Sequence, residues 1–315
     1  MLKFEDIKKI LVIGSGIMGP GIAFSYSRGG FEVCLTDISE AALAEAKRTI
    51  ARQLDNMATI GEIAPEEAAG IFARISYNAD AKAAAEGAQY VVEAITEKSE
   101  LKKNLYEWLD TFLPDDAIIA SNTSYLNIFE LMPKRRQPYA AITHFFVPSH
   151  IMPLVEVVRG PETAEEVMDI VVRLQTSCGK IAPRMEKYTR GFFVNQAQSA
   201  LGGVANYLVD NGFCTPEQFD LAIKSSLFPR GVVLGVFQKA DFAGLNLAGD
   251  IMKENGTEHH SRLTMEHYNR GEYGIRTGKG FYDYSGRDLD ELQNESDRRL
   301  LEVLKIARKN IENPL

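Results

Sequence analysis

A glycine-rich turn near the N-terminus constrains the fold of this chain more than any other feature. The run Gly14-Ser15-Gly16-Ile17-Met18-Gly19 follows the apolar segment Ile10–Ile13 and precedes a helical stretch that ends at Gly29-Gly30. Glycines at this spacing let a strand turn tightly into a helix and let the backbone approach a ligand. The N–H groups that open the helix favour a bound pyrophosphate. We therefore expect a dinucleotide cradle, formed by Gly14, Gly16, Ile17, Met18 and Gly19.

An acidic residue at the end of the next predicted strand supports this interpretation. Asp37 follows the apolar segment Glu32–Thr36, at about the distance that a ribose-binding carboxylate requires. Its two oxygens can accept both ribose hydroxyls and would repel a 2′-phosphate, and Ile38 offers no cation to attract one. NAD is therefore favoured over NADP. A glycine turn beside a solvated Asp is the structural alternative, and FAD uses the same kind of cradle.

Short apolar segments alternate with helical periodicity in the first part of the chain. Further strands are expected at Tyr90–Ala94, Ala117–Ala120, Ala140–Thr143 and Leu154–Val158. Helices are expected from Ser39 to about Ile60, at Ser99–Phe112 and at Ala164–Cys178, with Ser39 and Ser99 as N-caps. This alternation predicts a parallel sheet covered on both faces, that is, an α/β domain of the doubly wound Rossmann class.

Helical patterns dominate the second part of the chain. They are expected at Gly191–Asn211, Pro216–Ser225, about Val236–Glu254, His259–Arg270 and about Asp288–Asn310. The change of character lies near residues 186–190. We therefore predict two domains, a nucleotide-binding Rossmann domain at 1–187 and an all-α domain at 188–315.

The composition restricts the classes of partner. The 315 residues carry a net charge of −8 and no Lys/Arg run, which argues against nucleic-acid binding. No apolar run reaches the length of about 20 residues that a membrane span needs. The three cysteines have no paired spacing, and the N-terminus lacks a signal-peptide pattern. We expect a cytoplasmic protein without a metal site or membrane partner.

Seven segments match one known family in the same order along nearly the whole chain. They are Gly14–Gly19 with Gly21-Ile22-Ala23, Val91–Ile95, Ala120–Ser124, His144–Phe146, Pro153–Val158, Gly191–Asn195 and Thr277–Tyr284. In these segments the chain resembles the 3-hydroxyacyl-CoA dehydrogenase family. The resemblance implies an NAD-dependent oxidoreductase that oxidises the 3-hydroxyl of a 3-hydroxyacyl substrate to a 3-oxo product, and a helical domain that forms a homodimer.

The resemblance also implies roles for individual residues. His144 matches the base that takes the hydroxyl proton, Glu156 its acidic partner, and Ser124 and Asn195 the side chains that hold the reacting oxygen. The chemistry is reasonable in itself, because histidine titrates near neutrality and a carboxylate on its second nitrogen stabilises the imidazolium. Without the resemblance, His144 would be read as a structural residue at a strand end and Glu156 as an exposed charge.

Three further residues match positions near the cofactor. The resemblance places Glu97 and Lys102 near the nicotinamide ribose and Asn122 along the cofactor. The alternative for Lys102 is a charge on the solvated face of its helix. Thr123 and Ser124 could also cap the helix that follows them.

Departures from the family pattern concentrate around the expected substrate cleft. Val147 replaces the usual Asn, Gln196 the usual Arg, and Arg190 the usual Pro. The acyl-CoA enzymes also carry a serine and lysines after the position of Asp37 that meet the CoA phosphates, whereas no Lys or Arg lies between residues 53 and 70 here. Lys47, Arg48 and Arg52 are the remaining cations on this helix that could take their place.

The substrate therefore stays open between two forms of the same chemistry. One is a CoA thioester. The other is a small hydroxy acid or alcohol without CoA, of the carnitine, gulonate or pyridine-carboxylate type, whose carboxylate Arg184 or Arg190 would meet. A third alternative is a non-catalytic, crystallin-like dinucleotide-binding protein. The joint presence of His144, Glu156, Ser124 and Asn195 argues against that one.

Overall fold

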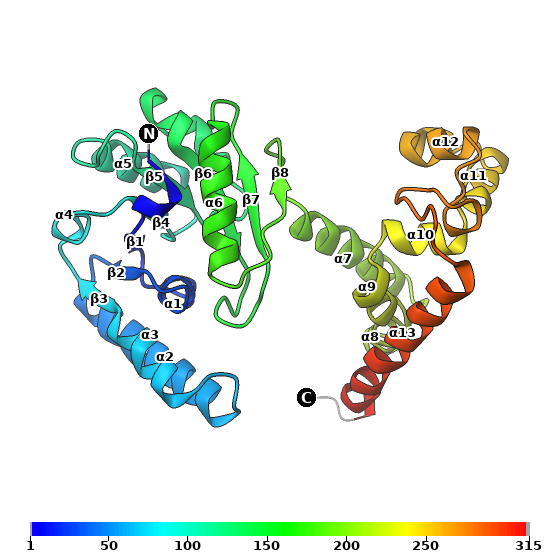
Figure 1. Ribbon diagram of the computed structural model, residues 1–315, viewed down its shortest axis with the longest axis horizontal. Helices are drawn as coiled ribbons and strands as arrows, with labels where there is room; N and C mark the ends of the chain where they lie inside the picture. The colour runs from blue at the N-terminus through cyan, green and yellow to red at the C-terminus, as the bar shows by residue number, and fades with distance from the viewer. Residues whose placement is uncertain (1, 313–315) are drawn as a thin grey trace. The chain divides into compact units, whose positions relative to one another are not determined.

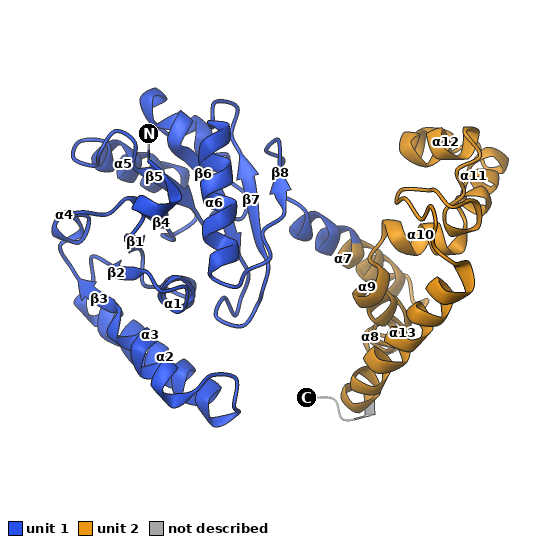
Figure 2. Ribbon diagram, in the orientation of Figure 1, with its two compact units in different colours: residues 1–200 blue, residues 201–315 orange. Residues whose placement is uncertain are grey.

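The computed structural model describes residues 2–312 and divides the chain into two compact units (Figure 2). The first unit comprises residues 1–200 and the second residues 201–315. The division lies inside helix α7 (Val194–Asp210). The sequence-based boundary at residue 187 falls earlier, between strand β8 (Arg184–Met185) and α7, and stays a prediction.

The first unit is built on an eight-stranded sheet in the order β3-β2-β1-β4-β5-β6-β7-β8 (Figure 1). The strands besides β8 are β1 (Lys9–Ile13), β2 (Glu32–Thr36), β3 (Ile75–Asn78), β4 (Tyr90–Glu93), β5 (Ile118–Ser121), β6 (Ala140–Phe145) and β7 (Val155–Arg159). All neighbours pair in parallel except β6 and β7, which are antiparallel. The doubly wound fold is confirmed, but the expectation of a purely parallel sheet is wrong at β7.

Helices cover both faces of this sheet, as predicted. Along β1, Ile10 and Val12 pack in one apolar cluster, whereas Leu11 and Ile13 pack in another. Successive side chains of a strand point to opposite faces, so two clusters mean two covered faces. One cluster includes residues of α1 (Gly19–Arg28), α2 (Glu40–Thr59), α3 (Pro65–Ala73) and α6 (Glu165–Ser177), and the other includes residues of α4 (Ala81–Ala84) and α5 (Ser99–Leu109).

Helix starts show where local sequence signals are reliable. The Ser39 hydroxyl accepts a hydrogen bond from the Ala42 N–H at 3.2 Å, so its predicted N-cap role is confirmed. Ser99 is not an N-cap: Lys98 occupies that position without a side-chain hydrogen bond, and Ser99 is the first helical residue. Helix α3 and strand β3 were not expected from the sequence.

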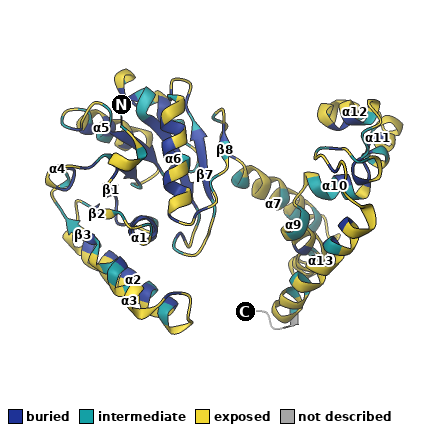
Figure 3. Ribbon diagram, viewed as in Figure 1, coloured by how far each residue is buried: buried dark blue, intermediate teal, exposed yellow. Residues whose placement is uncertain are grey.

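The second unit is helical. It contains the rest of α7, then α8 (Pro216–Ala222), a π-helical turn (Ile223–Leu227), α9 (Phe228–Leu234), α10 (Phe237–Ala243), α11 (Leu245–Glu254), α12 (Arg262–Asn269) and α13 (Leu289–Glu312). Ile275, Tyr284 and Leu292 form a small buried cluster. Figure 3 shows exposed residues along most of these helices, in contrast to the buried strands of the sheet.

The described residues contain neither a membrane-spanning helix nor a cluster of metal-binding side chains. None of their helices is long and apolar enough to cross a membrane. Among residues 2–312, no three His, Cys, Asp or Glu side chains are grouped so that they could hold a metal ion.

Candidate active site

The glycine-rich turn has the geometry of a phosphate cradle. Gly14 has a φ of +103°, and its N–H donates to the Thr36 carbonyl at 2.8 Å. A Cβ on Gly19 would overlap the Gly14 carbonyl oxygen, so helix α1 can begin this close to β1 only with glycine there. A Cβ on Gly16 would meet nothing within 4 Å. The turn is thus closed on the protein side and open at Gly16, where a ligand can approach.

Asp37 fixes the other side of this turn. One carboxylate oxygen accepts the Ser15 N–H at 2.8 Å, and the other accepts the Ser39 N–H at 3.0 Å. Each oxygen keeps a further lone pair for a ribose hydroxyl. The carboxylate therefore ties the glycine turn to the start of α2.

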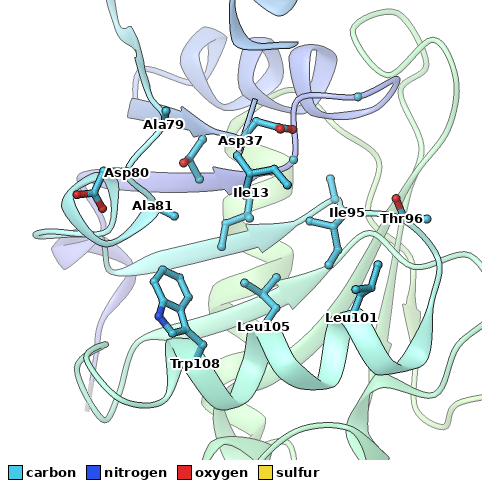
Figure 4. A pocket seen from close by; sticks show the side chains of 15 residues that line it. Ile13, Asp37, Ala79, Asp80, Ala81, Ile95, Thr96, Leu101, Leu105 and Trp108 are labelled. Carbon is cyan, nitrogen blue, oxygen red and sulfur yellow. The ribbon is translucent and has the colours of Figure 1, made fainter. Parts of the chain in front are cut away.

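A cavity of about 670 Å³ adjoins the turn and Asp37. Figure 4 shows Leu101, Leu105 and Trp108 projecting from α5 towards Ile13 and Asp37. One wall is thus apolar and aromatic, and the opposite wall carries the glycines and the acid. These features suit a dinucleotide, whose adenine is flat and apolar and whose ribose is polar. Trp108 was not predicted to line this cavity, although it lies on the apolar face of a predicted helix.

A buried ion cluster is formed by residues adjacent in sequence to Ala94 and Leu101, which line this cavity. Lys102 Nζ is 2.6 Å from Glu93 Oε1 and 3.3 Å from Glu97 Oε2, and the lysine side chain is 1% exposed. The other oxygen of Glu93 accepts hydrogen bonds from the hydroxyl groups of Tyr106 at 2.7 Å and Ser121 at 2.6 Å. The alternative of a solvated helix face for Lys102 is therefore wrong. Glu93 stands inside a family motif, but its sequence context alone does not predict this role.

Glu97 organises the loop that carries Ser124. Its Oε1 accepts the Thr123 hydroxyl at 2.5 Å and the N–H groups of Ser124 and Tyr125 at 2.9 and 3.0 Å. Burial alone would raise the pKa of Glu97, but the Thr123 hydrogen bond and the Lys102 charge outweigh it and lower the pKa. The carboxylate stays ionised and holds the loop in place.

Asn122 connects this loop to the strand of the expected base. Its Oδ1 accepts the Phe145 N–H at 2.8 Å, one residue beyond His144. Thr123 also accepts the Leu126 N–H at 3.0 Å, so it stabilises the turn that follows. The structure therefore brings the loop of Asn122 and Ser124 to the end of β6.

His144 and Glu156 face each other in the register of β6 and β7. His144 Nδ1 lies 2.8 Å from Glu156 Oε2, and both side chains are buried. Glu156 Oε1 accepts the N–H groups of Phe193 and Val194, each at 2.9 Å. Within the described residues, His144 Nε2 has no hydrogen-bond partner, which leaves this nitrogen for a substrate. Asn195, the other expected oxygen-binding residue, follows Val194 in the first turn of α7 and is half-buried.

Aromatic rings enclose the imidazole. The ring centroids of Phe146 and Phe192 lie 4.5 and 5.3 Å from that of His144. Phe192 is buried although it follows a glycine in a mostly polar segment. Both residues stand inside family motifs, but only the tertiary structure shows that they surround the expected base.

Family models match almost the whole chain. The model of the 3-hydroxyacyl-CoA dehydrogenase NAD binding domain matches residues 9–188, and that of the 3-hydroxyacyl-CoA dehydrogenase C-terminal domain matches residues 191–284. The chain belongs to the 3-hydroxyacyl-CoA dehydrogenase family. The fold and the family predicted from the sequence are confirmed, with an NAD-binding domain in the first unit and a helical region after it.

Relatives of two kinds resemble this family member. The 5-formyl-3-hydroxy-2-methylpyridine 4-carboxylate 5-dehydrogenase of Mesorhizobium japonicum is 28% identical, over 95% of this chain and 98% of the relative. The probable 3-hydroxybutyryl-CoA dehydrogenase of Bacillus subtilis is 32% identical, over 89% and 98%. The crystal structure of a 3-hydroxyacyl-CoA dehydrogenase from Archaeoglobus fulgidus shares the fold, with a TM-score of 0.77 and 24% identity over 95% and 98%.

Family membership settles the type of reaction and the cofactor. The protein is an NAD-dependent oxidoreductase that acts on a hydroxyl group, as the sequence predicted. The alternative of a non-catalytic, crystallin-like binding protein is thereby set aside.

Proposed function

We propose that this dehydrogenase oxidises the 3-hydroxyl of a 3-hydroxyacyl substrate to a 3-oxo group, with His144 as the general base. The observation that supports this most is the His144–Glu156 pair. Because Glu156 accepts two backbone N–H groups as well, it is an anchored acceptor rather than a mobile surface charge. Such a carboxylate holds the imidazole with Nδ1–H towards it and Nε2 free to accept a proton.

The reaction then divides between the protein and the cofactor. His144 Nε2 takes the proton of the substrate hydroxyl, and Glu156 stabilises the imidazolium that results. NAD, when bound, supplies the acceptor for the hydride that leaves the carbinol carbon. Ser124 and Asn195 hold the substrate oxygen, and Glu97 acts through the Ser124 backbone to position that hydroxyl.

The cofactor site follows the same logic. We infer that the N–H groups of Gly16, Ile17, Met18 and Gly19, together with the turn at Gly14, meet the pyrophosphate, and that Asp37 meets the adenosine ribose. Asn122, Glu97 and Lys102 lie on the nicotinamide side. The Lys102 ammonium contacts the carboxylates of both Glu93 and Glu97. Lys102 therefore acts on the nicotinamide side by holding Glu97 in place.

One observation favours a substrate without CoA as the second candidate. The pair of helices α2 and α3 carries no Lys or Arg between residues 53 and 70, whereas Asp55, Glu62, Glu66 and Glu67 lie there. A nucleotide with several phosphates gains little from such a surface. One relative that covers 95% of this chain is named for a pyridine carboxylate rather than a CoA ester.

A substrate screen tests both candidates. NADH oxidation is followed with acetoacetyl-CoA and with free 3-oxo acids, and NAD reduction with the corresponding hydroxy compounds. Turnover of either class that is abolished in His144→Gln supports the proposed reaction. Turnover that persists in this variant contradicts it.

We further propose that the second unit forms a homodimer with a second copy of this chain. A groove of about 400 Å³ between α9 and α13 is almost wholly apolar, and it is lined by Phe228, Pro229, Val232, Val303 and Ile306, among others. Val232 is 72% and Ile306 68% exposed. Apolar patches of this kind mark protein interfaces. Sedimentation of the wild type and of Val232→Glu tests the proposal, because the variant should sediment as a monomer.

We place the protein in the cytoplasm. The supporting observation is that Cys34, Cys178 and Cys214 are all free thiols, two of them buried. Detection of a fusion protein in a fractionated cell tests this assignment.

A further inference from the structure

We propose that Arg190 binds the carboxylate of the substrate, and that the substrate is therefore a compact hydroxy acid rather than a CoA thioester. This inference rests on the proposed oxidation at His144. It starts from a departure from the family pattern, since Arg190 stands where the family usually has proline. Arg190 belongs to the short segment from Tyr188 to Val194, which leads into helix α7.

This segment runs between the two sides of the reaction centre. At its beginning, the Tyr188 hydroxyl donates to the Tyr125 carbonyl at 2.6 Å, next to Ser124. At its end, the N–H groups of Phe193 and Val194 bind Glu156. Arg190 thus lies in a bridge between the oxygen-binding loop and the partner of the catalytic base.

The backbone holds Arg190 in a defined place. Gly191 has a φ of +83° and Phe192 a φ of +50°, so two successive residues are left-handed. A non-glycine residue in that region is uncommon and persists only where its surroundings enforce it. Here the enforcing contacts are the burial of Phe192 against His144 and the bonds to Glu156. The position of Arg190 is therefore coupled to the catalytic pair itself.

The charges distinguish Arg190 from the other candidate arginine. Arg184 is bound to three carboxylates, with Glu165 at 2.7 Å, Asp169 at 3.3 Å and Glu186 at 3.0 Å. The Glu165 hydrogen bond raises the pKa of Arg184, and its charge is neutralised. Arg190 is exposed and forms no ion pair with any of the described residues. Of these two arginines, Arg190 is therefore the one whose guanidinium is available to a substrate anion.

The reach of Arg190 limits the distance between the anion and the reacting hydroxyl. Its Cα is two residues from that of Phe192, a separation of at most about 7.6 Å, because consecutive Cα atoms are about 3.8 Å apart. Phe192 packs on His144. The Arg190 backbone therefore lies near the ring that packs on His144, and a substrate carboxylate close to the reacting hydroxyl is within the span of an arginine side chain. A carboxylate of a small acid meets this condition and binds guanidinium with two hydrogen bonds, whereas the CoA phosphates lie beyond the pantetheine arm.

A binding experiment tests the inference without depending on turnover. The enzyme with bound NAD, which cannot reduce a 3-oxo compound, is titrated by calorimetry with acetoacetate, with its uncharged methyl ester and with acetoacetyl-CoA, and each titration gives a Kd. Arg190→Gln should weaken acetoacetate binding by about 10- to 100-fold and leave the methyl ester unchanged. Lys187→Gln, which removes an exposed charge three residues away, should change neither.

The outcomes separate this inference from the proposed reaction. Acetoacetate that binds no tighter than its methyl ester, or an unchanged ratio of the two in Arg190→Gln, overturns the role of Arg190. Preferential binding of acetoacetyl-CoA that survives in Arg190→Gln overturns it as well. The proposed reaction fails by a different result, namely turnover that persists in His144→Gln.

Discussion

His144 Nδ1 and Glu156 Oε2 lie 2.8 Å apart because the two residues occupy facing positions on the antiparallel strands β6 and β7. Facing side chains of such a pair have Cβ atoms about 4.5–5.5 Å apart, close enough for a direct hydrogen bond. The sheet therefore sets the geometry of the pair, and the reversal of β7 is what creates it. A parallel β7 would have required a long crossover connection between the two residues.

Replacing either member of this pair should remove most of the activity. We expect His144→Gln to lower kcat by about 10²- to 10⁴-fold, because the substrate hydroxyl loses its base. Glu156→Gln should lower kcat by a similar amount, because its amide oxygen would take the Phe193 and Val194 N–H groups and its NH₂ group would donate to His144 Nδ1, which puts the imidazole proton on Nε2. Steady-state kinetics measures kcat, and NADH titration should show an unchanged cofactor Kd for His144→Gln. Additive losses in the double variant would contradict the idea of one catalytic unit.

Two glycines of the cradle should respond differently to the same substitution. A methyl group on Gly19 overlaps the Gly14 carbonyl, so Gly19→Ala should reduce the free energy of unfolding by about 1–3 kcal/mol. Gly16→Ala meets no protein atom and should leave stability unchanged while raising the Kd for NAD by about 10-fold or more. Urea unfolding and NADH titration measure the two effects. Equal stability losses in both variants would argue against the cradle described here.

Much of the first unit could be predicted because its signals are local. The strand, glycine turn and helix from Ile10 to Arg28 follow one another in the sequence, and Asp37 lies at a fixed spacing from them. The direction of β7 could also have been predicted. Only nine residues separate Phe145 from Val155, and a parallel crossover needs at least about 10–12.

Other features depend on residues that are distant in the sequence. Lys102 looks like a surface lysine within its helix, and only the position of Glu93 at the end of β4 shows that it is buried and paired. Phe192 joins the surroundings of His144 through an uncommon left-handed backbone that no local pattern announces. Arg184 and Arg190 were equivalent in the sequence, and the ion pairs of Arg184 distinguish them. The residues proposed for the chemistry could therefore be named from the sequence, but their supporting contacts could not.

The buried Glu93–Lys102 pair should contribute strongly to stability. Lys102→Met leaves the Glu93 carboxylate without its cation in a site that is 0% exposed, and removing one partner of a buried pair costs about 3–5 kcal/mol. Lys103→Met, on the same helix but 58% exposed, is the matched control and should cost less than about 1 kcal/mol. Urea unfolding measures both. A loss of activity in Lys102→Met without any loss of stability would assign the lysine to the cofactor alone.

Coenzyme preference should depend on Asp37. Replacing it by serine removes the charge that repels a 2′-phosphate while keeping one acceptor for the turn, and Ile38→Arg adds a cation beside it. The double variant should raise the Kd for NAD by about 10-fold or more and bring binding of NADP into the measurable range. Glu40→Ser, an exposed acid at the start of α2, controls for loss of charge. A preference for NAD that is unchanged in the double variant would place the adenosine ribose away from Asp37.

The second unit should lose stability in acid through Glu272. This carboxylate contacts His267 Nδ1 at 2.7 Å, Arg270 Nε at 2.9 Å and Lys279 Nζ at 3.1 Å. The hydrogen bonds from Arg270 and Lys279 lower the pKa of Glu272 from 4.5 to about 2. Because the folded pKa lies below the unfolded one, the unfolded chain binds the proton first as the pH falls.

The sign of the effect follows from this order. The stabilisation by Glu272 is fully present above about pH 4.5 and is lost as the pH falls from 4.5 towards 2. Glu272→Gln should therefore lower Tm at pH 7, and the Tm difference from the wild type should shrink between pH 4.5 and 2. Glu266→Gln, which removes the exposed partner of Arg262, is the matched control and should show a smaller difference throughout. Calorimetry at a series of pH values gives both curves. Parallel wild-type and Glu272→Gln curves across this range would mean that the carboxylate titrates alike in the folded and unfolded chains.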